Sequence, residues 1–104
     1  MMKINFCKEA EPVSDYEIEK FFQGNKNKEV IAISSMLLLY RFRVAVAKKE
    51  IEPFEIYVED FNGKMFHDVI SPDGKFNGLG KYNDIWLSDV LSQEEKYLNT
   101  LIGI

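Results

Sequence analysis

The stretch between Pro53 and Ile70 constrains the fold most, because it predicts two strands that pair with each other. From Phe54 to Val58 every second side chain is apolar, which is typical of a strand buried on one face. Asn62-Gly63 follows, and this dipeptide favours the tight turn of a hairpin. Residues 65–70 then return as the second arm. We therefore expect a β-hairpin over residues 54–70, held in a larger sheet.

The segment that precedes the hairpin has more than one interpretation. Residues 30–33 are mostly β-branched, which suits a buried strand. The residues that follow include Leu, Met, Ala, Arg and Lys, which are good helix formers. From Tyr40 to Val46, however, every second residue is aromatic or Val, which is the period of a strand. We expect a strand over 29–34 and then a helix over 35–49. One long helix is the first alternative, and one long strand is the second.

Weaker patterns predict short elements near the N-terminus. Residues 2–6 alternate weakly and favour a strand. Ser14 and Glu17 have the spacing of a capping box, in which the hydroxyl and the carboxylate each accept a hydrogen bond from a backbone N–H. Gly24 is well placed to end the helix that this box begins.

Beyond the hairpin, Pro72-Asp73-Gly74 predicts a turn, and Asp84 and Ser92 each stand where a helix can begin. All these elements together predict an α+β or α/β domain. We expect one sheet of about four strands that includes the hairpin, with helices packed on one face. The 104 residues, 46% of them hydrophobic, suffice for one core, so a single domain is expected over 1–104. The single cysteine, Cys7, indicates a reducing, cytoplasmic compartment.

Charge is distributed unevenly along the chain. Residues 1–49 hold nine Lys or Arg and six Asp or Glu, a net charge of +3. Residues 50–104 hold four Lys and eleven Asp or Glu, a net charge of −7, so the two halves sum to the −4 of the whole chain. An acidic surface attracts a basic protein surface and repels nucleic acid. We therefore expect another protein as the partner, and neither a membrane nor nucleic acid.

Four basic residues on the predicted helix are too sparse to follow a nucleic-acid backbone, and we expect their charged ends at the rim of the core. They are Arg41, Arg43, Lys48 and Lys49.

Side chains suited to catalysis are few. Nucleophilic catalysis would need Cys7 beside His67, the only histidine. Asp68 cannot easily orient His67, because adjacent strand residues point to opposite faces. A zinc site needs three or four convergent ligands. The glycines between Gly74 and Lys81 depart from the spacing of a phosphate-binding loop. We expect no enzyme activity, no metal and no cofactor.

Two segments carry a family resemblance. Residues 4–12 run from a predicted strand into Lys8-Glu9, and residues 29–38 run from another into Ser34-Ser35. In this order, they resemble the Walker B and switch segments of ABC-type AAA ATPases, and the likeness spans residues 4–90. Lys8 replaces the metal-binding Asp, Ser35 replaces the switch His, and no Walker A is present. The resemblance implies a degenerate half-domain that does not hydrolyse ATP and that pairs with, or imitates, a larger ATPase.

The sequence favours a non-catalytic protein–protein interaction module, such as an inhibitor or adaptor of a phage or another mobile element. Aromatic residues ringed by charge are the usual anchors of interfaces. The candidates for partner binding are Tyr57, Tyr82, Asp84, Trp86 and Asp89.

Two alternative functions stay open. A small enzyme or nucleotide-binding domain would use His67, Asp68, Glu9 and Cys7. A homodimeric structural protein would use the segment from Met36 to Val46 as its interface, because a helix there is apolar nearly all round.

Overall fold

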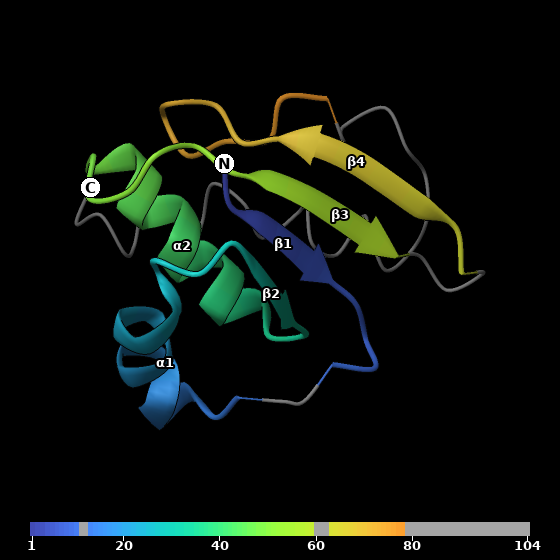
Figure 1. Cartoon of the computed structure of the whole chain (residues 1–104). Helices are drawn as coiled ribbons and strands as arrows, with labels where there is room; N and C mark the ends of the chain where they lie inside the picture. Colours follow the sequence, from blue (N-terminus) through green and yellow to red (C-terminus); the bar gives the residue numbers. More distant parts are fainter. Residues whose placement is uncertain (11–12, 60–62, 79–104) are drawn as a thin grey trace.

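Four short strands pair into one mixed sheet in the computed structural model, which describes residues 1–10, 13–59 and 63–78 (Figure 1). The elements are β1 (Lys3–Phe6), a 3-10 turn η1 (Asp15–Glu17), α1 (Ile18–Asn25), β2 (Val30–Ile33), α2 (Met36–Ala47), β3 (Glu55–Glu59) and β4 (Met65–Val69). The helices expected from Asp84 and Ser92 lie outside the described residues.

The strands lie in the order β2-β1-β3-β4. β1 is parallel to both β2 and β3, whereas β4 is antiparallel to β3. β3 and β4 form the expected hairpin, with Gly63 in the left-handed region at φ 79° between them. The prediction of a sheet of about four strands that contains a hairpin over 54–70 is confirmed.

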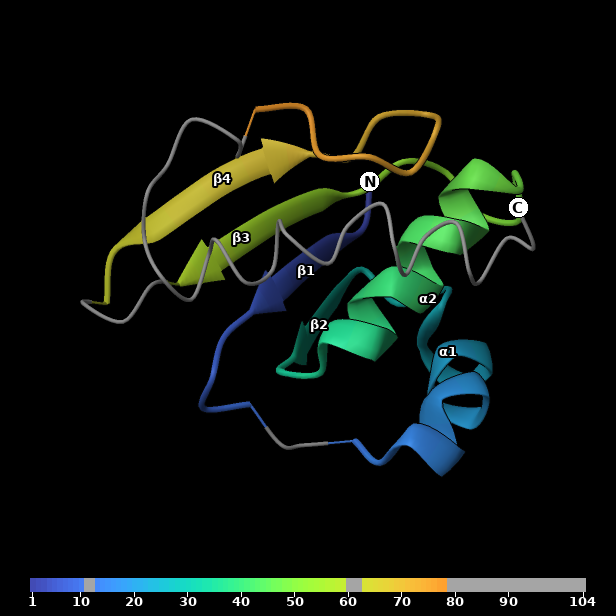
Figure 2. The same cartoon turned by 180° about the vertical axis from the view of Figure 1, so that it is seen from behind.

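One face of the sheet carries the core. Period-two alternation directs Ile4, Ile31, Ile56 and Phe66 to this face, where all four are buried. Both helices contribute to the same cluster, which confirms that the helices pack on one face. α1 packs against α2 through Phe22, whose ring meets that of Phe42 edge to face at 5.0 Å. Figure 2 shows the two helices lying together on one side of the strands.

α2 settles the ambiguous segment in favour of the strand-then-helix interpretation. Ser35 begins the helix, because its Oγ accepts a hydrogen bond of 3.2 Å from the backbone N–H of Leu38. The residues buried in α2 surround its axis: Leu38, Leu39, Tyr40, Phe42, Arg43, Val44, Ala45 and Val46. A helix that is buried on nearly all sides carries apolar residues all round its axis. Apolar residues at alternate positions from 40 to 46 are therefore compatible with a helix and do not indicate a strand.

The same burial bears on the homodimer hypothesis. From Leu38 to Val46 the apolar side chains of α2 pack in the chain's own core, which leaves little apolar surface of this segment for a second copy. None of the helices in the described ranges has the length and apolar character needed to span a bilayer.

The N-terminal helix begins and ends differently from the prediction. The Ser14 hydroxyl donates a 3.1 Å hydrogen bond to the Glu17 carboxylate, and neither group caps a backbone N–H. The two polar groups satisfy each other, so the capping box is wrong. Gly24 lies inside α1 rather than after it, and Asn25 and Lys26 complete the last turn without left-handed backbone.

Arg43 was expected at the rim of the core, and it is fully buried instead. Its Nε donates a 2.8 Å hydrogen bond to the Gly74 carbonyl, and its guanidinium lies 4.4 Å from the centre of the Phe76 ring. Gly74 has φ 82°, and a Cβ atom there would lie 2.5 Å from the Arg43 carbonyl oxygen. This close approach joins α2 to the turn that follows β4.

A second arginine of α2 forms an ion-pair network at the rim. Arg41 lies 2.7 Å from a Glu19 oxygen and 3.1 Å from a Glu50 oxygen, and its guanidinium stacks 3.8 Å above the Phe22 ring. The hydrogen bond from Arg41 lowers the pKa of Glu19 from 4.5 to about 2. The network links α1, α2 and the segment that follows α2.

Candidate functional site

The face of the sheet opposite α2 is a candidate site, because the described helices α1 and α2 both pack on the other face. Strand alternation directs these side chains to the open face: Lys3, Asn5, Val30, Ala32, Glu55, Tyr57, Glu59, Met65, His67 and Val69. β3 and β4 contribute Glu55, Tyr57, Glu59, Met65, His67 and Val69 to it. We call the first five of these residues the hairpin face.

A pair of rings lies at the centre of the hairpin face. Tyr57 and His67 are directly opposite each other in the β3–β4 register. Their rings lie 4.7 Å apart at an angle of 37°. The His67 side chain is 46% exposed, and Tyr57 is half-buried. The pairing holds the phenol in a fixed orientation while part of each ring stays open to solvent.

Carboxylates flank this pair along β3. Glu55 Oε1 lies 3.4 Å from His67 Nε2, so the two groups attract each other when His67 is protonated. Glu59 lies on the same face, opposite Met65, and Met65 is 50% exposed. The hairpin face therefore combines a ring pair and an exposed apolar side chain with two negative charges.

Of the five residues predicted to bind a partner, the structure describes only Tyr57. Tyr82, Asp84, Trp86 and Asp89 lie outside the described residues. The sequence pattern did not predict that His67 lies beside Tyr57.

The residues named for catalysis do not converge. Asp68 points away from His67 into the covered face, where it is buried. Its carboxylate accepts hydrogen bonds from three backbone N–H groups, at 2.8 Å from Val69 and Gly78 and at 2.9 Å from Asn77. Cys7 and Glu9 follow β1, which is separated from β4 by β3. Through these backbone groups, Asp68 organises the chain after β4.

No group of three or more His, Cys, Asp or Glu residues that could hold a metal occurs within residues 1–10, 13–59 and 63–78.

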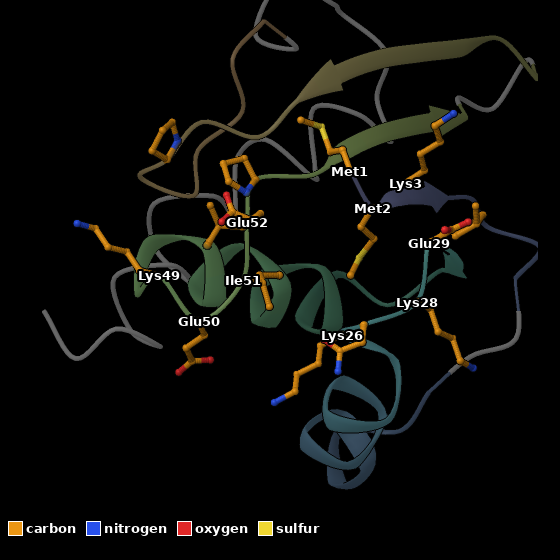
Figure 3. A pocket seen from close by; sticks show the side chains of 15 residues that line it. Met1, Met2, Lys3, Lys26, Lys28, Glu29, Lys49, Glu50, Ile51 and Glu52 are labelled. Atoms are coloured by element: carbon orange, nitrogen blue, oxygen red, sulfur yellow. The ribbon is translucent and has the colours of Figure 1, made fainter.

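A hollow of about 1070 Å³ lies where β1 and β2 begin and α2 ends. Its floor includes Met2 and Ile51, and its rim carries charged side chains of both signs. These are Lys3, Lys26, Lys28, Lys49, Glu29, Glu50 and Glu52. Figure 3 shows the four lysine side chains pointing away from one another. They do not form a cradle for an anion, and the glutamates add negative charge between them.

Sequence reasoning missed this hollow because its lining comes from several separate segments. No single motif spans residues 1–3, 26–30, 46–53 and 72, so only the folded chain brings them together.

Comparisons with protein-family models, with curated proteins and with solved structures found no match to this chain.

Proposed function

We propose that this chain is a non-catalytic protein–protein interaction module that binds a basic surface of another protein through its hairpin face. The observation that carries the proposal is the Tyr57–His67 ring pair, which lies on an open strand face between Glu55 and Glu59.

The arrangement of side chains on the hairpin face suits the binding of another protein. Aromatic side chains bring a large contact area at low cost in conformational entropy, and Tyr is enriched among the residues that dominate binding energies. Pairing with His67 already restricts the Tyr57 ring, so less freedom is lost on binding. The half-exposed Met65 adds an apolar side chain that adapts to the shape of a partner.

Charge supports a basic partner. The hairpin face carries two carboxylates, and the half of the chain that contains it has a net charge of −7. Complementary charge speeds association and selects among partners more than it adds affinity. Arg or Lys side chains on the partner would lie against Glu55 and Glu59.

The proposal includes a reducing, cytoplasmic setting and a role as an inhibitor or adaptor, in keeping with the single cysteine and the small size of the chain.

The experiment begins with capture of partners by the full chain from cells of its own host. The purified partner is then titrated against variants. In the test variant, Glu55→Lys and Glu59→Lys are combined. In the control, the same reversals are made at Glu29 and Glu52, which lie on the rim of the hollow. We expect the test variant to bind at least about tenfold more weakly than the control, since like charges now meet. Equal affinities would refute the hairpin face as the docking surface.

A relation to a degenerate ATPase is a second candidate. The order β1, α1, β2, α2, β3 and the parallel pairing of the first three strands support it. Fold-level likeness carries little functional weight by itself. Under this hypothesis the captured partner is an ATPase, and the purified chain does not hydrolyse ATP.

A further inference from the structure

The two edges of the sheet differ in how the described chain continues beside them. Just after β4 the chain turns back, so that Phe76 forms a bridge with Ile70, and the Asp68 carboxylate accepts hydrogen bonds from the N–H groups of Asn77 and Gly78. Beside β2, at the other edge, no described segment pairs with the outer side of the strand (Figures 1 and 2).

The hydrogen bonds to β1 identify which groups of β2 face outward. Lys3 N donates to the Glu29 carbonyl at 2.8 Å, and Cys7 N donates to the Ile33 carbonyl at 3.0 Å. In a parallel ladder, this pattern directs the N–H and C=O groups of Ile31 and Ile33 toward β1. The N–H and C=O groups of Val30 and Ala32 therefore point away from the sheet.

Apart from its short length of four residues, β2 carries none of the usual protections of an edge strand. Its sequence, Val-Ile-Ala-Ile, has no charge, no proline and no glycine that would form a bulge. Val30 is 56% exposed and Ala32 is also exposed. Such an edge can accept a further strand through its backbone alone.

We propose that two copies of this chain pair through β2, antiparallel, about a two-fold axis at Ile31. This register sets Val30 of each copy opposite Ala32 of the other. It uses the outward N–H and C=O groups of both residues in both copies. An axis at Val30 would instead require the N–H of Lys28, which is already bonded to the Asn25 carbonyl at 3.0 Å.

The side chains fit the same register. Val30 covers Ala32 of the second copy on the open face, and Ile31 meets its own counterpart on the covered face. Lys28 lies opposite Ser34 and Glu29 opposite Ile33, so no like charges face each other directly. β1 separates β2 from the hairpin, so this pairing leaves both hairpin faces available and is independent of the function proposed above.

The first test measures mass and amide exchange of the full chain from micromolar to millimolar concentration. We expect light scattering to approach twice the monomer mass of 12.1 kDa. We also expect the amides of Val30 and Ala32 to gain at least about tenfold protection over this range, because pairing with the second copy encloses them. The amides of Ile31 and Ile33 serve as internal references, since they are bonded to β1 at every concentration.

Two outcomes would overturn the proposal. One is the mass of a single copy throughout the range. The other is protection of Val30 and Ala32 that does not change with concentration, which would mean that another part of the same chain covers the edge.

Two variants then locate the interface. Ala32→Pro removes an outward N–H without removing a bond to β1, and proline is tolerated in edge strands. Ala32→Thr keeps that N–H and serves as the control. We expect a monomer for the first and a dimer for the second. A dimer that survives in a folded Ala32→Pro chain contradicts pairing at β2, and if that variant does not fold, the exchange data on the unaltered chain decide.

Discussion

The two faces of the sheet are built from the same strands but differ in burial. On the covered face, Ile56 and Val58 of β3 are fully buried beneath the helices. On the open face, Glu55, Tyr57 and Glu59 of the same strand stay partly exposed. Side chains one position apart in β3 therefore lie in different surroundings, since those on one face pack in the core and those on the other stay accessible. Substitutions on each face should separate effects on the fold from effects on recognition.

The largest effect is expected from Ile56→Ala. This change removes apolar atoms from a fully buried position and leaves a cavity, so it should lower the free energy of unfolding by about 2–5 kcal/mol. Denaturant titration followed by circular dichroism measures the loss. A loss below about 1 kcal/mol would show that the covered face is less tightly packed than described.

A somewhat smaller effect is expected from Gly74→Ala, which tests how the covered face is closed by the turn after β4. The added Cβ would lie 2.5 Å from the Arg43 carbonyl oxygen, so the backbone must shift. We expect a loss of about 2–3 kcal/mol in the free energy of unfolding.

Gly63→Ala provides the matched control for Gly74. Gly63 also has a positive φ, but the nearest atom to its added Cβ, Glu59 Oε1, lies 3.9 Å away. At Gly63 we expect only the cost of placing a Cβ in left-handed backbone, which lowers the free energy of unfolding by about 1–2 kcal/mol. Equal losses for the two variants would mean that the contact with Arg43 contributes nothing.

A still smaller effect on stability is expected from Tyr57→Ala, the neighbour of Ile56 on the open face. It removes a cross-strand pair with His67, which contributes about 0.2–1 kcal/mol. The free energy of binding to the partner should decrease by more than the free energy of unfolding does. The contrast between the two faces breaks down if Tyr57→Ala costs as much stability as Ile56→Ala.

The smallest effect concerns acid pH at the rim of the covered face. The pKa of Glu19 is lowered to about 2 by Arg41, so this carboxylate contributes stability above pH 4.5 that is lost as the pH falls toward 2. Because the Glu19 side chain is 60% exposed, solvent screening leaves about 1 kcal/mol or less. As the pH is lowered, the free energy of unfolding should therefore fall less steeply for Glu19→Gln than for the unaltered chain. Parallel curves would show that the ion pair has no net effect.

The covered face could be predicted from the sequence because it depends on local patterns. Alternation in β3, the Asn62-Gly63 turn and the β-branched run at 30–33 each indicate an element without knowledge of its neighbours. α2 needed a choice between two periods, since a helix surrounded by core shows no polar stripe. The contact between Arg43 and Gly74 joins residues 31 positions apart, and no local pattern signals it.

The hairpin face depends on register, which the sequence left open. A two-residue turn at Asn62-Gly63 would pair Tyr57 with Asp68, whereas the structure pairs Tyr57 with His67. A shift of one residue exchanges the side chains that share a face. The capping box failed for a similar reason, because Ser14 and Glu17 each had a choice of partners and bonded to each other.

The central place of β1 has a consequence for how the chain folds during synthesis. β1 is made first, but both of its partners come later, and the second, β3, is complete only at Glu59. The side of β1 that pairs with β3 must therefore stay unpaired until residue 59 has been made, even though β2 is complete at Ile33. Pairings this distant in sequence are slow to form and leave apolar segments exposed in the meantime. Removing residues 1–6 would take away the middle of the sheet, so a tag or truncation at that end acts on the assembly of the whole fold.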